Sequence, residues 1–326
     1  MLGFQPAESL VVVPFGPDLP ALRVDLPTNP GQREDVWEAV HEGLNRHVRG
    51  TARAGIICFT ADNEAAERAS HHLANRLDTI GVTTYPRLQT HDDRWRDLDT
   101  VKAGVIDTRT VTRVAAEMVL AGAAEPAVSR AALAASLVGD RTGVARALDV
   151  VRARVTSSPP RVERAWAQAR LQQFHADGNR LTDRDAARTL VSLETIDTRD
   201  ALWADMTREN AASHVALWTD LTRRAPDEAR TAPATMLAFS SWLRGDGARA
   251  WCALDQIPPG PPYSMAAIVA SMLEHGLHPR EWERLDEQMR QASNEVDESL
   301  NARSAHDPRR DPPRATDTTQ RSNPRR

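Results

Sequence analysis

Patterns typical of β-strands are confined to the part of this chain before residue 106. Residues 10–15 form an apolar run, a Gly-Pro turn follows, and residues 21–26 form a second short run, which together predict a β-hairpin. Residues 55–60 are apolar at consecutive positions, as expected for a strand covered on both faces. Beyond residue 106, apolar side chains recur at helical spacing, as in the stripe of Val144, Leu148, Val151 and Val155. The sequence therefore predicts an α/β N-terminal domain with a small mixed sheet (a β-hairpin plus βα units), followed by an all-α helical domain.

These patterns divide the chain into three segments. The α/β domain is predicted over residues 1–105 and the helical domain over residues 106–291. Residues 292–326 are polar and rich in arginine and proline. Such a segment cannot bury enough apolar surface to offset its chain entropy, so we expect a disordered tail.

Composition excludes several classes of protein. The formal net charge is −4, which gives no global basic field, and specific binding of nucleic acid is not expected. No apolar run approaches the roughly 20 residues that span a bilayer, and no signal peptide is apparent. We therefore expect no membrane partner and a cytoplasmic location. Lys102 is the only lysine, which together with the abundant alanine indicates a high-GC bacterial source.

The sequence contains no strong catalytic or metal-binding motif. A P-loop, a GxGxxG loop, GxSxG and HExxH are all missing. Cys58 and Cys252 match no CxxC spacing and are predicted to be small buried hydrophobes. Neighbouring histidines occur in pairs whose spacings do not suit a shared ion: His41 with His47, His71 with His72, and His275 with His278. We expect these to be caps and surface groups, with no metal site and no cofactor.

The predicted hairpin gathers one group of polar side chains. Antiparallel pairing brings the start of the first strand beside the end of the second, which places Glu8 and Ser9 near Asp25. Arg23 lies one pleat away, on the same face as Asp25. This group is a candidate binding site. The favoured interpretation is nevertheless structural: Glu8 or Ser9 satisfies backbone donors of the turn, and Arg23 pairs with Asp25.

A second candidate site follows the strand predicted at residues 55–60. Ligands of α/β sheets usually bind beyond the carboxyl ends of parallel strands. Thr60, Asp62 and Asn63 occupy such a position, and Asp62 is suited to cap the next helix. The start of a helix also favours anions.

Three separated motifs resemble an actinobacterial family called domain of unknown function 4192. They are LGFQPAESLVV at residues 2–12, LRVDLP at residues 22–27, and a stretch over residues 237–266 that contains GDGA and YSMA. The resemblance implies no particular reaction, because the family is named for its lack of a known function. It implies a helical segment ahead of Leu2, and it implies cysteines after an Arg-Trp pair. Arg94 and Trp95 are present here without those cysteines, so no metal or redox role is carried over.

Two functions remain open from the sequence. The favoured hypothesis is a non-enzymatic protein that binds a protein partner or a small ligand. The alternative is an enzyme that acts on a small polar substrate at one of the two sites in the α/β domain. A deep cavity lined by two or more of those polar groups would favour the enzyme.

Overall fold

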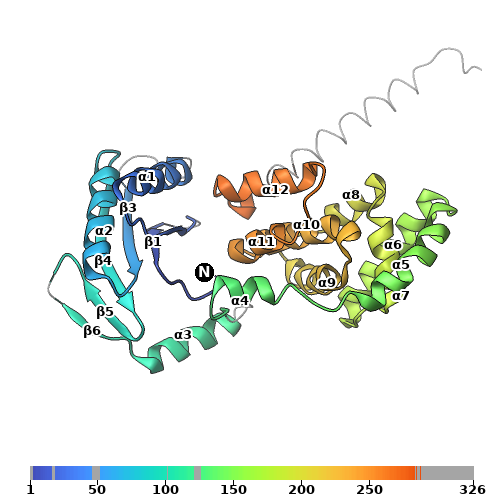
Figure 1. The fold of residues 1–326 in the computed structure, drawn as a ribbon, viewed down its shortest axis with the longest axis horizontal. Helices are drawn as coiled ribbons and strands as arrows, with labels where there is room; N and C mark the ends of the chain where they lie inside the picture. Colours follow the sequence, from blue (N-terminus) through green and yellow to red (C-terminus); the bar gives the residue numbers. More distant parts are fainter. Residues whose placement is uncertain are drawn as a thin grey trace, which may run out of the picture. The chain divides into compact units, whose positions relative to one another are not determined.

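A computed structural model describes residues 3–16, 19–45, 52–100, 102–120, 126–282, 284 and 287 (Figure 1). A mixed sheet occupies the N-terminal part and helices follow it, which confirms the predicted fold class. The tail predicted over residues 292–326 lies outside the described residues.

The sheet contains six strands in the order β2-β1-β3-β4-β5-β6. Their bounds are β1 Ser9–Pro14, β2 Leu22–Asp25, β3 Ala52–Phe59, β4 Val82–His91, β5 Arg94–Asp97 and β6 Ala103–Val105. β1 pairs antiparallel with both β2 and β3, whereas β3 and β4 are parallel. The hairpin of β1 and β2 is therefore confirmed. β6 was not predicted, because three residues are too few to show a period.

Helices α1 (Pro30–Asn45) and α2 (Asn63–Asp78) pack on one face of this sheet. Alternate residues of the central strands point to that face, and Leu10 and Ile56 meet Val40 of α1 and Leu73 of α2 in one buried cluster. α1 begins directly after the loop that follows β2. Its first residue is Pro30, which suits the first helical position because proline has no N–H to leave unpaired.

The rest of the described chain is helical. The helices are α3 Thr108–Leu120, α4 Arg130–Ala135, α5 Thr142–Thr156, α6 Pro160–Asp177, α7 Asp183–Ser192, α8 Ile196–Ala204, α9 Ala211–Arg224, α10 Asp227–Leu243, α11 Gly247–Leu254 and α12 Ser264–Glu274. α10 is central, since Met236, Leu237 and Phe239 are fully buried and α9, α7, α11 and α12 all pack against it. None of the helices in the described ranges is long and apolar enough to cross a membrane.

Candidate functional site

The structure places the predicted hairpin residues together at one end of the sheet. Ser9 is the register partner of Asp25, as the antiparallel hairpin requires. Arg23 Nη2 lies 2.6 Å from the Ser9 hydroxyl oxygen and 2.8 Å from a carboxylate oxygen of Asp25. The guanidinium thus joins the two strands. The pairing of Arg23 with Asp25 agrees with the structural interpretation of this group.

The second predicted group joins the first. β3 runs antiparallel to β1, so Phe59 is paired with Ser9 and Thr60 follows at the same end of the sheet. The Thr60 hydroxyl donates to a carboxylate oxygen of Glu8 at 2.9 Å. Residues predicted as two separate sites therefore form one cluster.

Helix α2 begins in this cluster. Asp62 is its N-cap, and one carboxylate oxygen accepts from the N–H groups of Glu64 and Ala65, both at 2.9 Å. Asn63 is the first helical residue, and its carbonyl accepts from Arg96 at 3.5 Å. These contacts stabilise the start of the helix.

Neighbouring strands close the cluster from the other side. Gln89 of β4 donates to the Thr60 carbonyl at 3.0 Å, and Arg96 of β5 donates to the Gln89 side-chain oxygen at 2.9 Å. Ser9, Thr60 and Gln89 are all buried. Of the seven predicted site residues, Arg23 alone lines the larger described cavity. This cavity therefore does not bring together two or more of the predicted polar groups.

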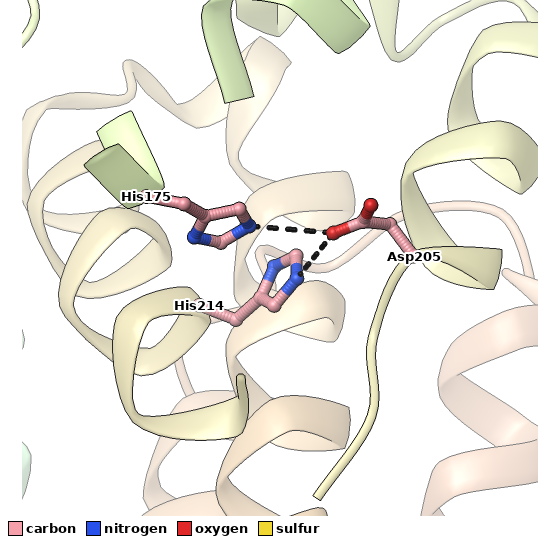
Figure 2. A group of neighbouring side chains, drawn as sticks. All are labelled: His175, Asp205 and His214. Carbon is pink, nitrogen blue, oxygen red and sulfur yellow. Dashed lines mark hydrogen bonds and ion pairs between the residues drawn. The ribbon is translucent and has the colours of Figure 1, made fainter. Parts of the chain in front are cut away.

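A different group of side chains, which the sequence did not predict, lies in the helical part (Figure 2). His175, Asp205 and His214 point toward one another from three separate segments. Asp205 Oδ2 lies 3.3 Å from His175 Nε2 and 3.1 Å from His214 Nε2. The two imidazole rings meet edge to face, with their centroids 4.6 Å apart. One carboxylate oxygen of Asp205 therefore makes a hydrogen-bond contact with each histidine.

Helix ends position these three residues. His175 lies in the last turn of α6, which ends at Gly178 with φ of +65°, a conformation that glycine adopts without strain. Asp205 is the C-cap of α8, and His214 lies in the first turns of α9. The turn between α8 and α9 is held by Asn210, whose side chain accepts from the Thr207 N–H at 2.7 Å.

Side-chain amides hold the carboxylate of Asp205 in place. Gln172 Nε2 donates to Asp205 Oδ1 at 2.9 Å. Asn210 Nδ2 donates to the Asp205 carbonyl at 2.7 Å and approaches Oδ2 at 3.4 Å. The amide of Asn210 is oriented by the Thr207 N–H on its oxygen, so its nitrogen must face Asp205. The side chains of Gln172 and Asn210 thus hold Asp205 in place as a hydrogen-bond acceptor.

Two more side chains extend the group in opposite directions. Toward the surface, His175 Nδ1 lies 2.6 Å from the hydroxyl oxygen of half-buried Ser213. Toward the core, the indole Nε1 of Trp218 donates to His214 Nδ1 at 3.1 Å. The contacts run continuously from Trp218 through His214, Asp205 and His175 to Ser213.

Burial controls the protonation of His214. Its side chain is fully buried, and this desolvation, with a smaller contribution from the charge of His175, lowers its pKa from 6.5 to about 4. His214 is therefore neutral at physiological pH.

The two cysteines are not reactive groups of this site. Burial raises the pKa of the Cys58 thiol to about 12, which leaves it protonated and unreactive. Cys58 and Cys252 are both buried, as expected from the sequence.

No local sequence signal reveals the histidine group. His175, Asp205 and Ser213 come from three separate segments, and their spacing matches no short motif. Proximity along the chain singles out other histidines, such as His71 and His72. Only the packing of α6 against α8 and α9 brings these three residues together.

Comparison with protein families matches residues 1–280 to the family described as Domain of unknown function (DUF4192). No curated protein and no solved structure matches the chain. The family match agrees with the resemblance carried by the three sequence motifs.

Proposed function

The chain belongs to the DUF4192 family, whose description assigns no function, and we propose from the geometry of the helical part that it is a hydrolase with Ser213 as its nucleophile. The observation that carries this proposal is the 2.6 Å contact between the Ser213 hydroxyl oxygen and His175 Nδ1. A serine, a base and a group that orients the base are the components of a serine nucleophile.

The positions of the protons support this assignment. Asp205 accepts from Gln172, and an ionised carboxylate has no proton to give. His175 Nε2, which faces Asp205, must then carry the proton of the neutral ring. His175 Nδ1 is left as an acceptor, and it faces the hydroxyl of Ser213. We assign this tautomer from the hydrogen-bond network.

The proposed reaction is hydrolysis of an ester. Ser213 Oγ forms a bond to the carbonyl carbon while His175 Nδ1 takes the hydroxyl proton. The bond to the leaving alkoxide then breaks, and His175 returns the proton to that alkoxide. Water next attacks the acyl carbon while His175 Nδ1 takes a proton from the water. The bond between that carbon and Ser213 Oγ then breaks, the proton passes to Oγ, and the carboxylic acid leaves. Asp205 stabilises the transient charge on His175 throughout.

The position of Ser213 suits the negative charge that such a reaction develops. Ser213 lies in the first turn of α9, where the backbone N–H groups leave a partial positive charge. The N-cap residue Asn210 makes no side-chain bond to these groups, because its side chain is used on Asp205 and Thr207. The N–H groups of Ser213 and His214 donate to the Asn210 carbonyl at 3.0 and 3.2 Å, so stabilisation of an oxyanion beside Ser213 would come from the partial charge of the helix N-terminus and not from these two N–H groups.

Turnover of p-nitrophenyl esters of short acids tests the proposal. We expect release of nitrophenol by the purified full chain and its loss in Ser213→Ala. His175→Ala should lower the rate by about a hundredfold to ten-thousandfold, the usual contribution of a general base. Esterase activity that persists in Ser213→Ala would contradict the proposal.

Ser271 supplies a matched control. Its hydroxyl oxygen also lies near a histidine, 3.1 Å from His275 Nδ1. However, that nitrogen is 2.7 Å from the Ser271 carbonyl, which can only accept, so the nitrogen carries a proton and cannot act as a base. Ser271→Ala should leave turnover unchanged.

The non-enzymatic binding function expected from the sequence is the second candidate. At the end of the sheet, Glu8, Arg23 and Thr60 bond to other groups of the protein, as expected if this cluster is structural, and this argues against the enzyme that the sequence placed there as an alternative. A thermal-shift screen of metabolites and metal ions tests it, because a ligand that binds the native state raises the melting temperature. A hit without esterase activity would favour binding over hydrolysis.

A further inference from the structure

His175, Asp205 and His214 have the side-chain types of a metal centre. Their ligand atoms all lie within 4.8 Å of one another. Two imidazoles and a carboxylate are a common set of ligands for zinc and related ions. The question is whether the remaining hydrogen bonds of these residues permit an ion to bind.

Trp218 decides this question through its contact with His214. The indole N–H can only donate, and it lies 3.1 Å from His214 Nδ1. Nδ1 must therefore accept and carries no proton. The single proton of the neutral ring is then on Nε2, where it is donated to Asp205 Oδ2 at 3.1 Å.

A metal ion needs the opposite arrangement of protons. A histidine that binds through Nε2 carries its proton on Nδ1, where it usually donates to a carboxylate, a carbonyl or water. At His214 that proton would point at the N–H of Trp218, and two donors would face each other. Trp218 is fully buried, one helical turn along α9 from His214, so it has little room to move away.

We infer that Trp218 is a positioning residue that closes the His175–Asp205–His214 group to metal ions and keeps it as a hydrogen-bonded network. By holding Nδ1 as an acceptor, it makes His214 a permanent donor to Asp205. The carboxylate then keeps Oδ2 directed at His175. The proposed hydrolase uses the same carboxylate, but the proton positions are measured without substrate, so the two ideas can fail separately.

The first test is nitrogen NMR of the full chain labelled with ¹⁵N-histidine. We expect His214 Nε2 to carry a proton at neutral pH and Nδ1 to carry none. Its signals are identified by their loss in His214→Gln. A protonated Nδ1 in the wild-type chain would overturn the inference.

The second test is titration with Zn²⁺ alone, followed by calorimetry. The wild-type chain should show no site that depends on His214. Trp218→Phe removes the opposing N–H, and we expect affinity for Zn²⁺ to rise by about 10–100-fold. This is the usual size of the change in metal affinity when a residue hydrogen-bonded to a metal ligand is altered. The gain should disappear when Asp205→Asn is added.

Two results would overturn the role given to Trp218. One is zinc binding by the wild-type chain that is lost in His214→Gln. The other is a folded Trp218→Phe chain that gains no affinity for Zn²⁺. If Trp218→Phe fails to fold, benzothienylalanine at position 218 keeps the shape of the indole and replaces its N–H by sulfur, and the same gain in affinity is expected.

Discussion

At the scale of single residues, burial keeps His214 neutral in the folded protein, with a consequence for stability at mildly acid pH. Its pKa is about 4 in the folded chain, against 6.5 for an ordinary imidazole. Between these values the unfolded chain binds a proton that the folded chain does not, so stability falls as the pH falls. Above about pH 6.5 both states are neutral, and the contribution of His214 is complete.

The loss of stability caused by protonation of His214 in the unfolded chain is measurable by urea unfolding at about pH 7 and about pH 5. We expect the free energy of unfolding to fall more between these values in the wild-type chain than in His214→Gln, which has no imidazole to protonate at this site. His71 is exposed on α2, and His71→Gln should behave like the wild type. An equal fall in His214→Gln and wild type would show that this imidazole is not held neutral.

At the scale of helices, α6 and α7 are joined by a buried ion pair. The guanidinium of Arg188 donates twice to the carboxylate of Glu163, each time at 2.9 Å. The same guanidinium lies over the ring of Trp166, with its central carbon 4.0 Å from the ring centroid. The Glu163 side chain is 5% exposed, and the hydrogen bond from Arg188 lowers its pKa below the usual range. The pair therefore stabilises the fold above the ordinary pKa of a glutamate and is lost as the pH falls through the lowered pKa.

Arg188→Ala removes both guanidinium hydrogen bonds from this buried carboxylate and leaves it the hydrogen bond from Ser158. We expect a loss of about 3–5 kcal/mol in the free energy of unfolding at neutral pH. The loss should shrink in acid, where Glu163 becomes protonated. Arg152→Ala is the matched control, because the pair of Arg152 with Glu194 is exposed and should be worth less than about 1 kcal/mol. Similar losses in the two variants at neutral pH would contradict the burial argument.

At the scale of the whole molecule, periodicity predicts most of the fold. The change from strand patterns to helical stripes near residue 106 marks the observed change from sheet to helices. Hairpin pairing predicts Ser9 near Asp25, and the structure makes the two residues register partners. The antiparallel pairing of β1 with β3, which brings Thr60 to Glu8, was not predicted, because strand order is not encoded in local patterns.

The histidine group marks the limit of such prediction. A hydrophobic stripe shows which face of a helix is buried, but not which helix covers it. The contacts of His175 and Asp205 depend on how α6, α8 and α9 pack, and on a turn held by the side chains of Asn210 and Thr207. Functional residues that share no segment of sequence become visible only in the folded chain.

Activation of Ser213 by His175 is tested most directly by selective labelling of serines. A fluorophosphonate reacts with activated serines and is located by mass spectrometry of peptides. We predict that the wild-type chain is labelled at Ser213 and not at Ser271, and that His175→Ala abolishes the label. Equal labelling of the two serines, or labelling of Ser213 that survives in His175→Ala, would contradict the account.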